Sequence, residues 1–160
     1  MRLTAEDFKE VYLIISHDDC FWSAKDDGIT EINLPNYIIT LLENDSCYVL
    51  RPMEGALFFL FPVNYVCYDL HTIILPKVRE KCFLSAKQAI SWFMKNVPQC
   101  KKIITHIPEH HKRAMMLSAQ MGMEEEGIIK EAFLFNSELQ NLHIWGNSVS
   151  ELKKRNKEVA

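Results

Sequence analysis

Apolar residues alternate along the chain between a helical spacing and the two-residue spacing of strands. They recur every three or four positions from Phe8 to Ile15, which predicts a first helix over residues 5–16. A second helix is predicted over residues 34–42, where Pro35 precedes another apolar run. Both helices come before the first strand-like segment, so the chain opens with a helical region.

Three runs rich in β-branched and aromatic residues follow, at residues 47–51, 57–62 and 65–75. Gly55 and Asn64 stand between them, and residues of this kind are typical of tight turns. Strands joined by turns this short can only run antiparallel. The sequence therefore predicts an antiparallel meander after the two helices.

The central region alternates strands with helices. It contains a strand at 66–75, a basic loop at 77–81, a helix at 85–96, a strand at 102–107, and a helix that opens after Pro108 and ends at Gly122. Two consecutive strands with a helix between them pair in parallel. We therefore expect 66–75 and 102–107 to be neighbouring parallel strands.

A hairpin closes the chain, with strands at 127–135 and 139–145 around a turn at 136–138. The predicted fold is therefore α+β (mixed α/β), a mixed sheet of about six or seven strands with helices on both faces. We expect one domain over residues 1–146. Residues 147–160 are highly charged, which predicts a C-terminal helix or tail.

Composition narrows the function classes. The chain has 160 residues, of which 48% are hydrophobic and 24% charged, as in soluble globular proteins. Its net charge of −3 does not favour nucleic acid as a partner. No apolar run reaches the roughly 18 residues of a membrane span, and no signal-peptide pattern opens the chain. Five scattered cysteines without a Cys-x-x-Cys pair indicate free thiols, so we expect a cytoplasmic protein.

Asp69 and His71 are the candidate catalytic residues. They lie two positions apart on a predicted strand, so their side chains share one face of the sheet. A histidine beside a carboxylate can act as a general base toward an amine. A purely structural role, with His71 bonded to Asp69 or to backbone, is the alternative.

Three further histidines, His106, His110 and His111, invite comparison with a metal site. Pro108 interrupts the helical phase between the first and the other two, so the three need not share a face. No cysteine or carboxylate completes a ligand set at the usual spacing. We therefore expect no metal.

Two stretches of the central region carry a resemblance to a known family. The first is PKVREKCFL at residues 76–84, and the second is HKRAMMLSAQMGM at residues 111–123. They resemble the Arg/Gln-x-x-Gly-x-Gly/Ala loop and the Asn-x-x-Ala-x-x-Leu-Tyr-x-x-x-Gly-Phe helix of the GNAT N-acetyltransferase superfamily. The resemblance covers residues 47–145 and implies that the two parallel strands splay apart at one end.

The resemblance implies an acetyl-CoA site at which Arg79, Lys81 and His111 contact the cofactor. Several positions depart from the family pattern. The loop glycines are replaced by Glu80, Cys82 and Leu84, and the general-acid tyrosine is replaced by Ser118. Glycine lets phosphate oxygens approach the backbone, and serine is a far weaker acid than a phenol. These departures predict weak CoA binding and reduced catalysis.

A narrower resemblance joins residues 107–122, 126–129 and 142–146 to a small phage-encoded group labelled as head-assembly proteins of short-tailed temperate phages. It implies a role in phage head (virion) assembly in the host cytoplasm, with virion or assembly proteins as partners. A homo-oligomer is also compatible with this resemblance. The alternatives are an active N-acetyltransferase with an unknown amine acceptor and a generic interaction module.

Overall fold

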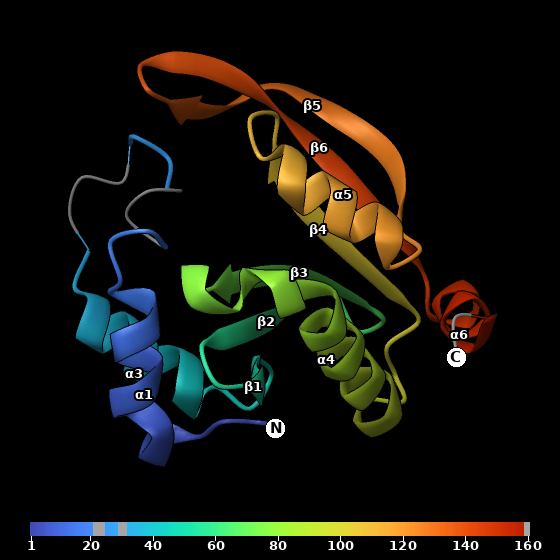
Figure 1. Ribbon diagram of the computed structural model, residues 1–160, viewed down its shortest axis with the longest axis horizontal. Coiled ribbons are helices and arrows are strands. Elements are labelled where there is room, and N and C mark those ends of the chain that lie inside the picture. Colours follow the sequence, from blue (N-terminus) through green and yellow to red (C-terminus); the bar gives the residue numbers. More distant parts are fainter. Residues whose placement is uncertain (21–24, 29–31, 159–160) are drawn as a thin grey trace.

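A computed structural model describes residues 1–20, 25–28 and 32–158. Figure 1 shows a curved mixed sheet with helices on both sides. Its six strands run in the order β1-β2-β3-β4-β6-β5. They are β1 (Tyr48–Met53), β2 (Ala56–Pro62), β3 (Cys67–Ile74), β4 (Lys102–Pro108), β5 (Glu124–Phe135) and β6 (Glu138–Ser148). The predicted mixed α/β fold is confirmed.

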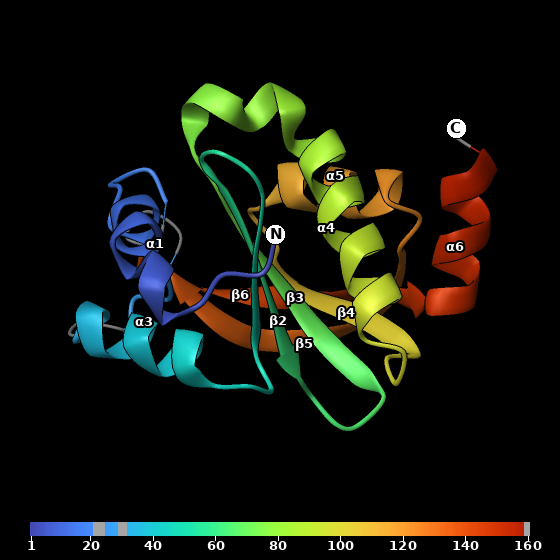
Figure 2. The ribbon, with the colours of Figure 1, turned by 90° about the horizontal axis from the view of Figure 1, so that it is seen from below.

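Two helical groups cover opposite faces of the sheet. The described helices are η1 (Ala5–Asp7), α1 (Phe8–Ile15), α3 (Leu34–Glu43), η2 (Pro76–Lys81), α4 (Cys82–Asn96), α5 (Lys112–Gln120) and α6 (Val149–Glu158). Figure 2 shows α1 and α3 together at one side, with α4 and α5 at the other and α6 at the far end. None of the described helices has both the length and the apolar character to span a bilayer.

The period of two in β2 explains the two cores. Phe58 and Leu60 point into the larger core, together with Phe93 of α4. Leu57 and Phe59 point to the opposite face, where Ile38 of α3 completes a smaller core. All of these side chains are at most 4% exposed, so this strand is buried on both faces.

The pairing of β3 with β4 is parallel, as predicted, and it is short. Cys67, Tyr68 and Asp69 pair with the segment from Lys102 to Ile104, and no later residues of the two strands are paired. All other neighbouring strands pair antiparallel. Beyond Asp69 the two strands diverge, which divides the sheet into a leaf of β1–β3 and a leaf of β4–β6 (Figure 1).

The segment predicted as a basic loop is helical instead. Residues Pro76–Lys81 form the 3₁₀ helix η2, which runs directly into α4, so that helix begins at Cys82 and not at residue 85. Pro76 favours this start because its fixed φ suits the first helical position, where no backbone donor is needed. The Cys82 N–H donates to the carbonyl of Arg79.

Two tight turns fix the C-terminal half. Asn136 and Ser137 have φ of 50° and 63°, the left-handed pair of a two-residue hairpin turn between β5 and β6. Gly122 ends α5 with φ of 85°, and the Met123 N–H donates to the Ser118 carbonyl at 3.0 Å. A Cβ at Gly122 would lie 2.8 Å from Cδ of Arg155, so glycine also makes room for α6.

The C-terminal helix α6 packs on the main core through Val149 and Leu152. Leu152 is fully buried. Leu152→Ala is expected to lower the free energy of unfolding by about 3 kcal/mol, because it removes buried methyl groups and leaves a cavity. Urea unfolding measures this, with the exposed neighbour Lys153→Ala as control and an expected change within about 0.5 kcal/mol. Equal small changes in both variants would show that α6 contributes little to the fold.

Candidate active site

A cavity of about 1180 Å³ lies where the two leaves of the sheet separate. Residues of β3 and β4, including His71, Thr72 and Thr105, line its centre. α1 and α3 bound it on one side, and η2, α4 and α5 on the other. Its volume exceeds the roughly 300–1,000 Å³ that is typical of small-molecule sites. Its lining includes residues from both faces of the sheet, because the two strands separate there.

Asp69 holds two histidines at the point where the strands diverge. Its Oδ2 lies 2.9 Å from Nδ1 of His106 and 3.2 Å from Nε2 of His71. Asp69 and His71 lie on the same face of β3, as the spacing of two residues predicts. His106 joins them because Asp69 pairs with Ile104, which places His106 on the same face of β4.

The charge state of Asp69 follows from these contacts. Burial raises the pKa of its carboxyl, but hydrogen bonds and positive charge from His71 and His106 outweigh burial and bring the pKa below its ordinary value. The group is therefore a carboxylate at neutral pH. Nε2 is the ring nitrogen of His71 that faces Asp69. When His71 is neutral and donates its Nε2–H to this carboxylate, Nδ1 is the nitrogen that can take up a proton.

Packing also orients His71. The ring of Phe61 meets it edge to face, with centroids 5.5 Å apart and planes at 68°. About half of the His71 side chain remains exposed, and the residue lines the cavity. The site therefore presents a fixed imidazole with a free nitrogen at the surface of a large cavity, which is the arrangement that proton abstraction requires.

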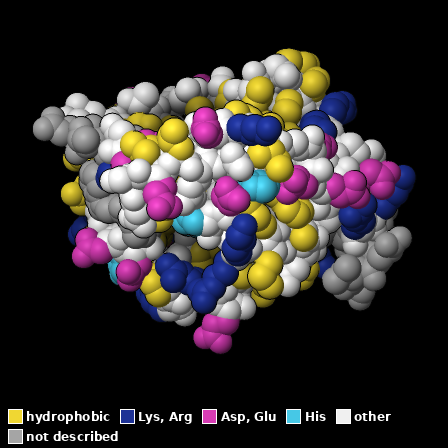
Figure 3. Space-filling model, turned by 90° about the horizontal axis from the view of Figure 1, so that it is seen from above, with side chains coloured by type: hydrophobic (Ala, Val, Ile, Leu, Met, Phe, Trp, Pro, Cys, Tyr) yellow, Lys and Arg dark blue, Asp and Glu magenta, His cyan; other side chains and the backbone are white. Residues whose placement is uncertain are grey.

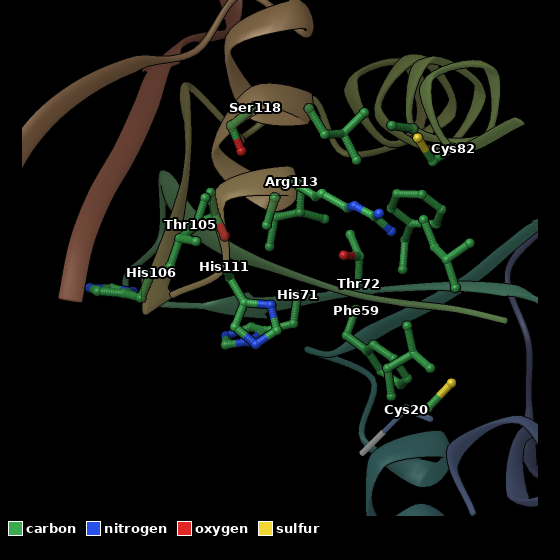
Figure 4. A pocket seen from close by; sticks show the side chains of 18 of the residues that line it. Cys20, Phe59, His71, Thr72, Cys82, Thr105, His106, His111, Arg113 and Ser118 are labelled. Atoms are coloured by element: carbon green, nitrogen blue, oxygen red, sulfur yellow. The ribbon is translucent and has the colours of Figure 1, made fainter. Parts of the chain in front are cut away.

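Basic side chains gather near the mouth of the cavity. Arg79 of η2 and Arg113 of α5 both line it. Figure 3 shows a hollow in this face with Lys and Arg side chains along its edge, and Figure 4 shows Arg113 extending from α5 into the cavity. Arg79 also donates to the carbonyl of Asp19 at 3.2 Å. Lys81 is exposed and does not line the cavity.

The three residues that stand at the glycine positions of the family's loop differ in their surroundings. Glu80 and Cys82 line the cavity, whereas Leu84 faces solvent and is 50% exposed. Because η2 is helical, the N–H groups of Val78 and Cys82 are already bonded to carbonyls. An anion bound here would therefore rely on side-chain charge rather than on a cradle of free backbone donors.

His111 precedes the first turn of α5 and lines the cavity. Burial lowers its pKa, and the neighbouring His110 lowers it further. A neutral His111 can donate one hydrogen bond to a ligand but brings no positive charge to a phosphate. The His110 ring stacks on Phe135, with centroids 3.8 Å apart, and its Nδ1 contacts Gln140.

The three histidines of the predicted metal comparison have different main partners. His106 belongs to the Asp69 cluster and lines the cavity, as does His111, whereas His110 packs against the hairpin with its ring centroid 4.2 Å from that of His111. Among the residues that the structure describes, no three His, Cys, Asp or Glu side chains form a group that could hold a metal ion.

Two functional candidates were not apparent in the sequence. The sequence offers His106 only as one of three histidines of a possible metal group, because its partnership with Asp69 depends on the register of two strands that are far apart in the chain. Arg113 looked like any exposed helical cation, and only the packing of α5 turns it into the cavity.

Comparison with known proteins gives the class of fold. Neither a protein-family model nor a curated protein sequence matches the chain. A solved structure of mutant forms of the spermidine/spermine N-acetyltransferase SpeG from Vibrio cholerae is similar, with a TM-score of 0.76 and 16% identity over 97% of this chain and 95% of that one. At this identity the similarity shows the fold alone.

Two other solved structures agree. Spermidine N-acetyltransferase from Vibrio cholerae in complex with CoA and spermine has a TM-score of 0.73 at 17% identity, covering 96% of each chain. An N-acetyltransferase from Staphylococcus aureus Mu50 has a TM-score of 0.72 at 15% identity, over 92% of this chain and 95% of that one. The protein therefore has the GNAT fold, as the motif resemblance implies.

Proposed function

We propose that the protein is an N-acyltransferase that moves an acyl group, in the simplest case acetyl, from coenzyme A to an amine. The observation that carries this proposal is the cavity at the strand splay, which is lined both by the cations Arg79 and Arg113 and by His71 and His106 of the Asp69 cluster. The similarity to N-acetyltransferases over nearly the whole chain supports it.

His71 is the general base of this proposal. An amine is mostly protonated at neutral pH, so it must lose a proton before it can attack a carbonyl carbon. The free Nδ1 of His71 accepts that proton, and the Asp69 carboxylate stabilises the imidazolium that forms. The amine nitrogen then forms a bond to the thioester carbon, the C–S bond breaks, and the second nitrogen proton ends on the thiol sulfur.

The replacement of the family's tyrosine by Ser118 does not prevent this reaction. A thiol has a pKa of about 8.5, so its thiolate leaves far more easily than an alkoxide would. Serine cannot supply the proton, because its hydroxyl is a much weaker acid. The departing sulfur then takes its proton from the amine or from water, which predicts an enzyme that works without a side-chain general acid.

Arg113 is expected to hold the phosphates of the donor. Arg113→Gln should weaken CoA binding about tenfold and reduce its dependence on salt, because a charge-assisted phosphate contact is lost while the length of the side chain is nearly kept. Isothermal titration at two salt concentrations measures both effects. Lys112→Gln is the matched control, since Lys112 is an exposed neighbour that does not line the cavity. Equal losses in the two variants would mean that only overall charge matters.

The test of the function is direct. Purified protein is incubated with acetyl-CoA and a panel of primary amines that includes polyamines, aromatic amines and amino-acid amides. Release of free thiol and the mass of the acylated amine are followed, with a reaction lacking the amine as control. Amine-dependent thiol release with the matching product supports the proposal. CoA binding without any transfer across the panel, or no CoA binding, would refute it.

The phage head-assembly function, with virion proteins as partners and the host cytoplasm as location, rests on the sequence resemblance alone. No feature of the described residues adds to it. Complementation separates the two hypotheses, by supplying a phage that lacks the gene with the His71→Ala variant. Growth would favour an assembly role that is independent of chemistry, and failure with a folded variant would favour the enzyme.

A further inference from the structure

The cavity extends past the catalytic region into the main core, and acetyl transfer does not need this extension. Its inner end is lined by apolar side chains from the sheet, from α4 and from the turn after α5. These residues are at most 6% exposed: Phe58, Leu70, Ile90, Met121 and Met123. They form a buried apolar part of the lining, which contrasts with the exposed cations Arg79 and Arg113 that line the same cavity.

Small side chains leave the way to this apolar end open. Ala86 of α4 and Ala114 and Ser118 of α5 line the cavity between the two helices. Ser118 is 8% exposed, so its wall position is well inside the protein (Figure 4). Any larger side chain at these three positions would enter the space. The two methionines at the end are unbranched and adapt readily to a ligand.

The charges of the cavity set the direction in which a donor lies. The phosphates belong at Arg79 and Arg113, and the reacting carbonyl belongs near His71, where the amine loses its proton. The carbons attached to that carbonyl must then continue either toward the amine or into the apolar end. The first direction is blocked by the acceptor itself, so the apolar end is the natural place for the acyl chain.

We propose that the preferred donor is an acyl-CoA whose acyl chain is longer than acetyl. This inference rests on the proposed function and names its donor. The chemistry is unchanged: the amine nitrogen bonds to the acyl carbon, the C–S bond breaks, one amine proton goes to His71, and the thiol sulfur gains the other. What the longer chain adds is the burial of its methylene groups against Ile90, Met121 and Met123.

Burial of apolar carbon gives the expected size of the effect. Each fully buried methylene strengthens binding by up to about fourfold. Acetyl-, butyryl-, hexanoyl- and octanoyl-CoA are titrated into the wild-type protein by calorimetry, without an acceptor. The Kd of hexanoyl-CoA is expected to be lower than that of acetyl-CoA by at least about tenfold. A Kd that is flat or rises with chain length overturns the proposal.

Turnover separates this inference from the function on which it rests. With an accepted amine, kcat/KM should rise with chain length in parallel with binding. Transfer that is fastest with acetyl-CoA would overturn the inference and leave the N-acyltransferase function in place. Tighter binding of long acyl chains without transfer to any amine would refute the function, while it would still assign the apolar end to an acyl ligand.

A variant with a larger side chain in the cavity wall tests whether the acyl chain binds in this part of the cavity. Ser118→Phe puts a ring into the wall, so the preference for hexanoyl-CoA over acetyl-CoA should fall by about tenfold while acetyl-CoA binding changes little. Met116→Phe is the matched control, because Met116 is an exposed residue of the same helix outside the cavity. If Ser118→Phe does not fold, Ala114→Val serves the same purpose. An unchanged preference in a folded filling variant would refute the placement.

Discussion

Replacement of His71 by alanine is expected to lower kcat by about 10²–10⁴-fold, the usual contribution of a general base. The imidazole lies 3.2 Å from the Asp69 carboxylate and lines the cavity, and an alanine side chain cannot take up a proton. The binding of CoA should stay nearly constant, because this variant keeps the proposed phosphate contacts Arg79 and Arg113. Steady-state kinetics with a saturating amine and calorimetry with CoA measure the two quantities.

His17→Ala is the matched control for this variant. His17 has a similar exposure and also lies near an aspartate, Asp19, but it does not line the cavity. Its loss should leave kcat within about twofold. If the His71→Ala enzyme keeps its activity, the base is His106 or a water molecule held by Asp69. The double variant His71→Ala, His106→Ala would then distinguish these two.

Asp69→Asn is expected to lower kcat by roughly 10–10²-fold, which is less than the loss of His71 itself, since the carboxylate orients the base and stabilises its charged form. The amide keeps the shape of the side chain but carries no negative charge. Without the negative charge, the protonated form of His71 is less stable, so a lower pH is needed to protonate this base. The acidic limb of the pH profile of kcat/KM should therefore move to lower pH. A profile that keeps its shape at reduced height would mean that Asp69 is purely structural.

Stability gives Asp69 a second pH signature. Its carboxyl has a lowered pKa in the folded protein, so its stabilising contribution is complete above the ordinary value of about 3.9 and is lost as the pH falls through the folded value. The wild type should therefore be more stable than Asp69→Asn near pH 7. This difference should shrink below about pH 4, as urea unfolding at several pH values would show.

Much of the fold could be predicted from local patterns. The period of two in the strand containing Asp69 and His71 places both side chains on one face, and Pro108 and Gly122 mark the region of α5. These signals are local, because they depend on the backbone conformation of a few neighbouring residues. The parallel pairing of β3 and β4 follows from the helix between them, which is also visible in the sequence.

The parts that could not be predicted depend on distant contacts. The partnership of His106 with Asp69 requires the register Asp69–Ile104, which no local pattern specifies. The conformation of residues 77–81 was predicted wrongly as a loop, since their charges are typical of a solvated turn while Pro76 starts a 3₁₀ helix. The direction of Arg113 depends on how α5 packs, and exposed helical cations are common.

The short seam between β3 and β4 has a consequence for how the protein opens. Within the part of the chain that the structure describes, three residue pairs, from Cys67–Lys102 to Asp69–Ile104, join the two leaves of the sheet along their strands. Separating three residue pairs requires less free energy than opening the long antiparallel ladders on either side. The two leaves should therefore behave as separate units in amide hydrogen exchange. Backbone amides at the seam are expected to exchange before those in the middle of β2 or β6. A ligand that contacts both leaves would then slow exchange at the seam, a signal that reports cavity occupation without any assay of chemistry.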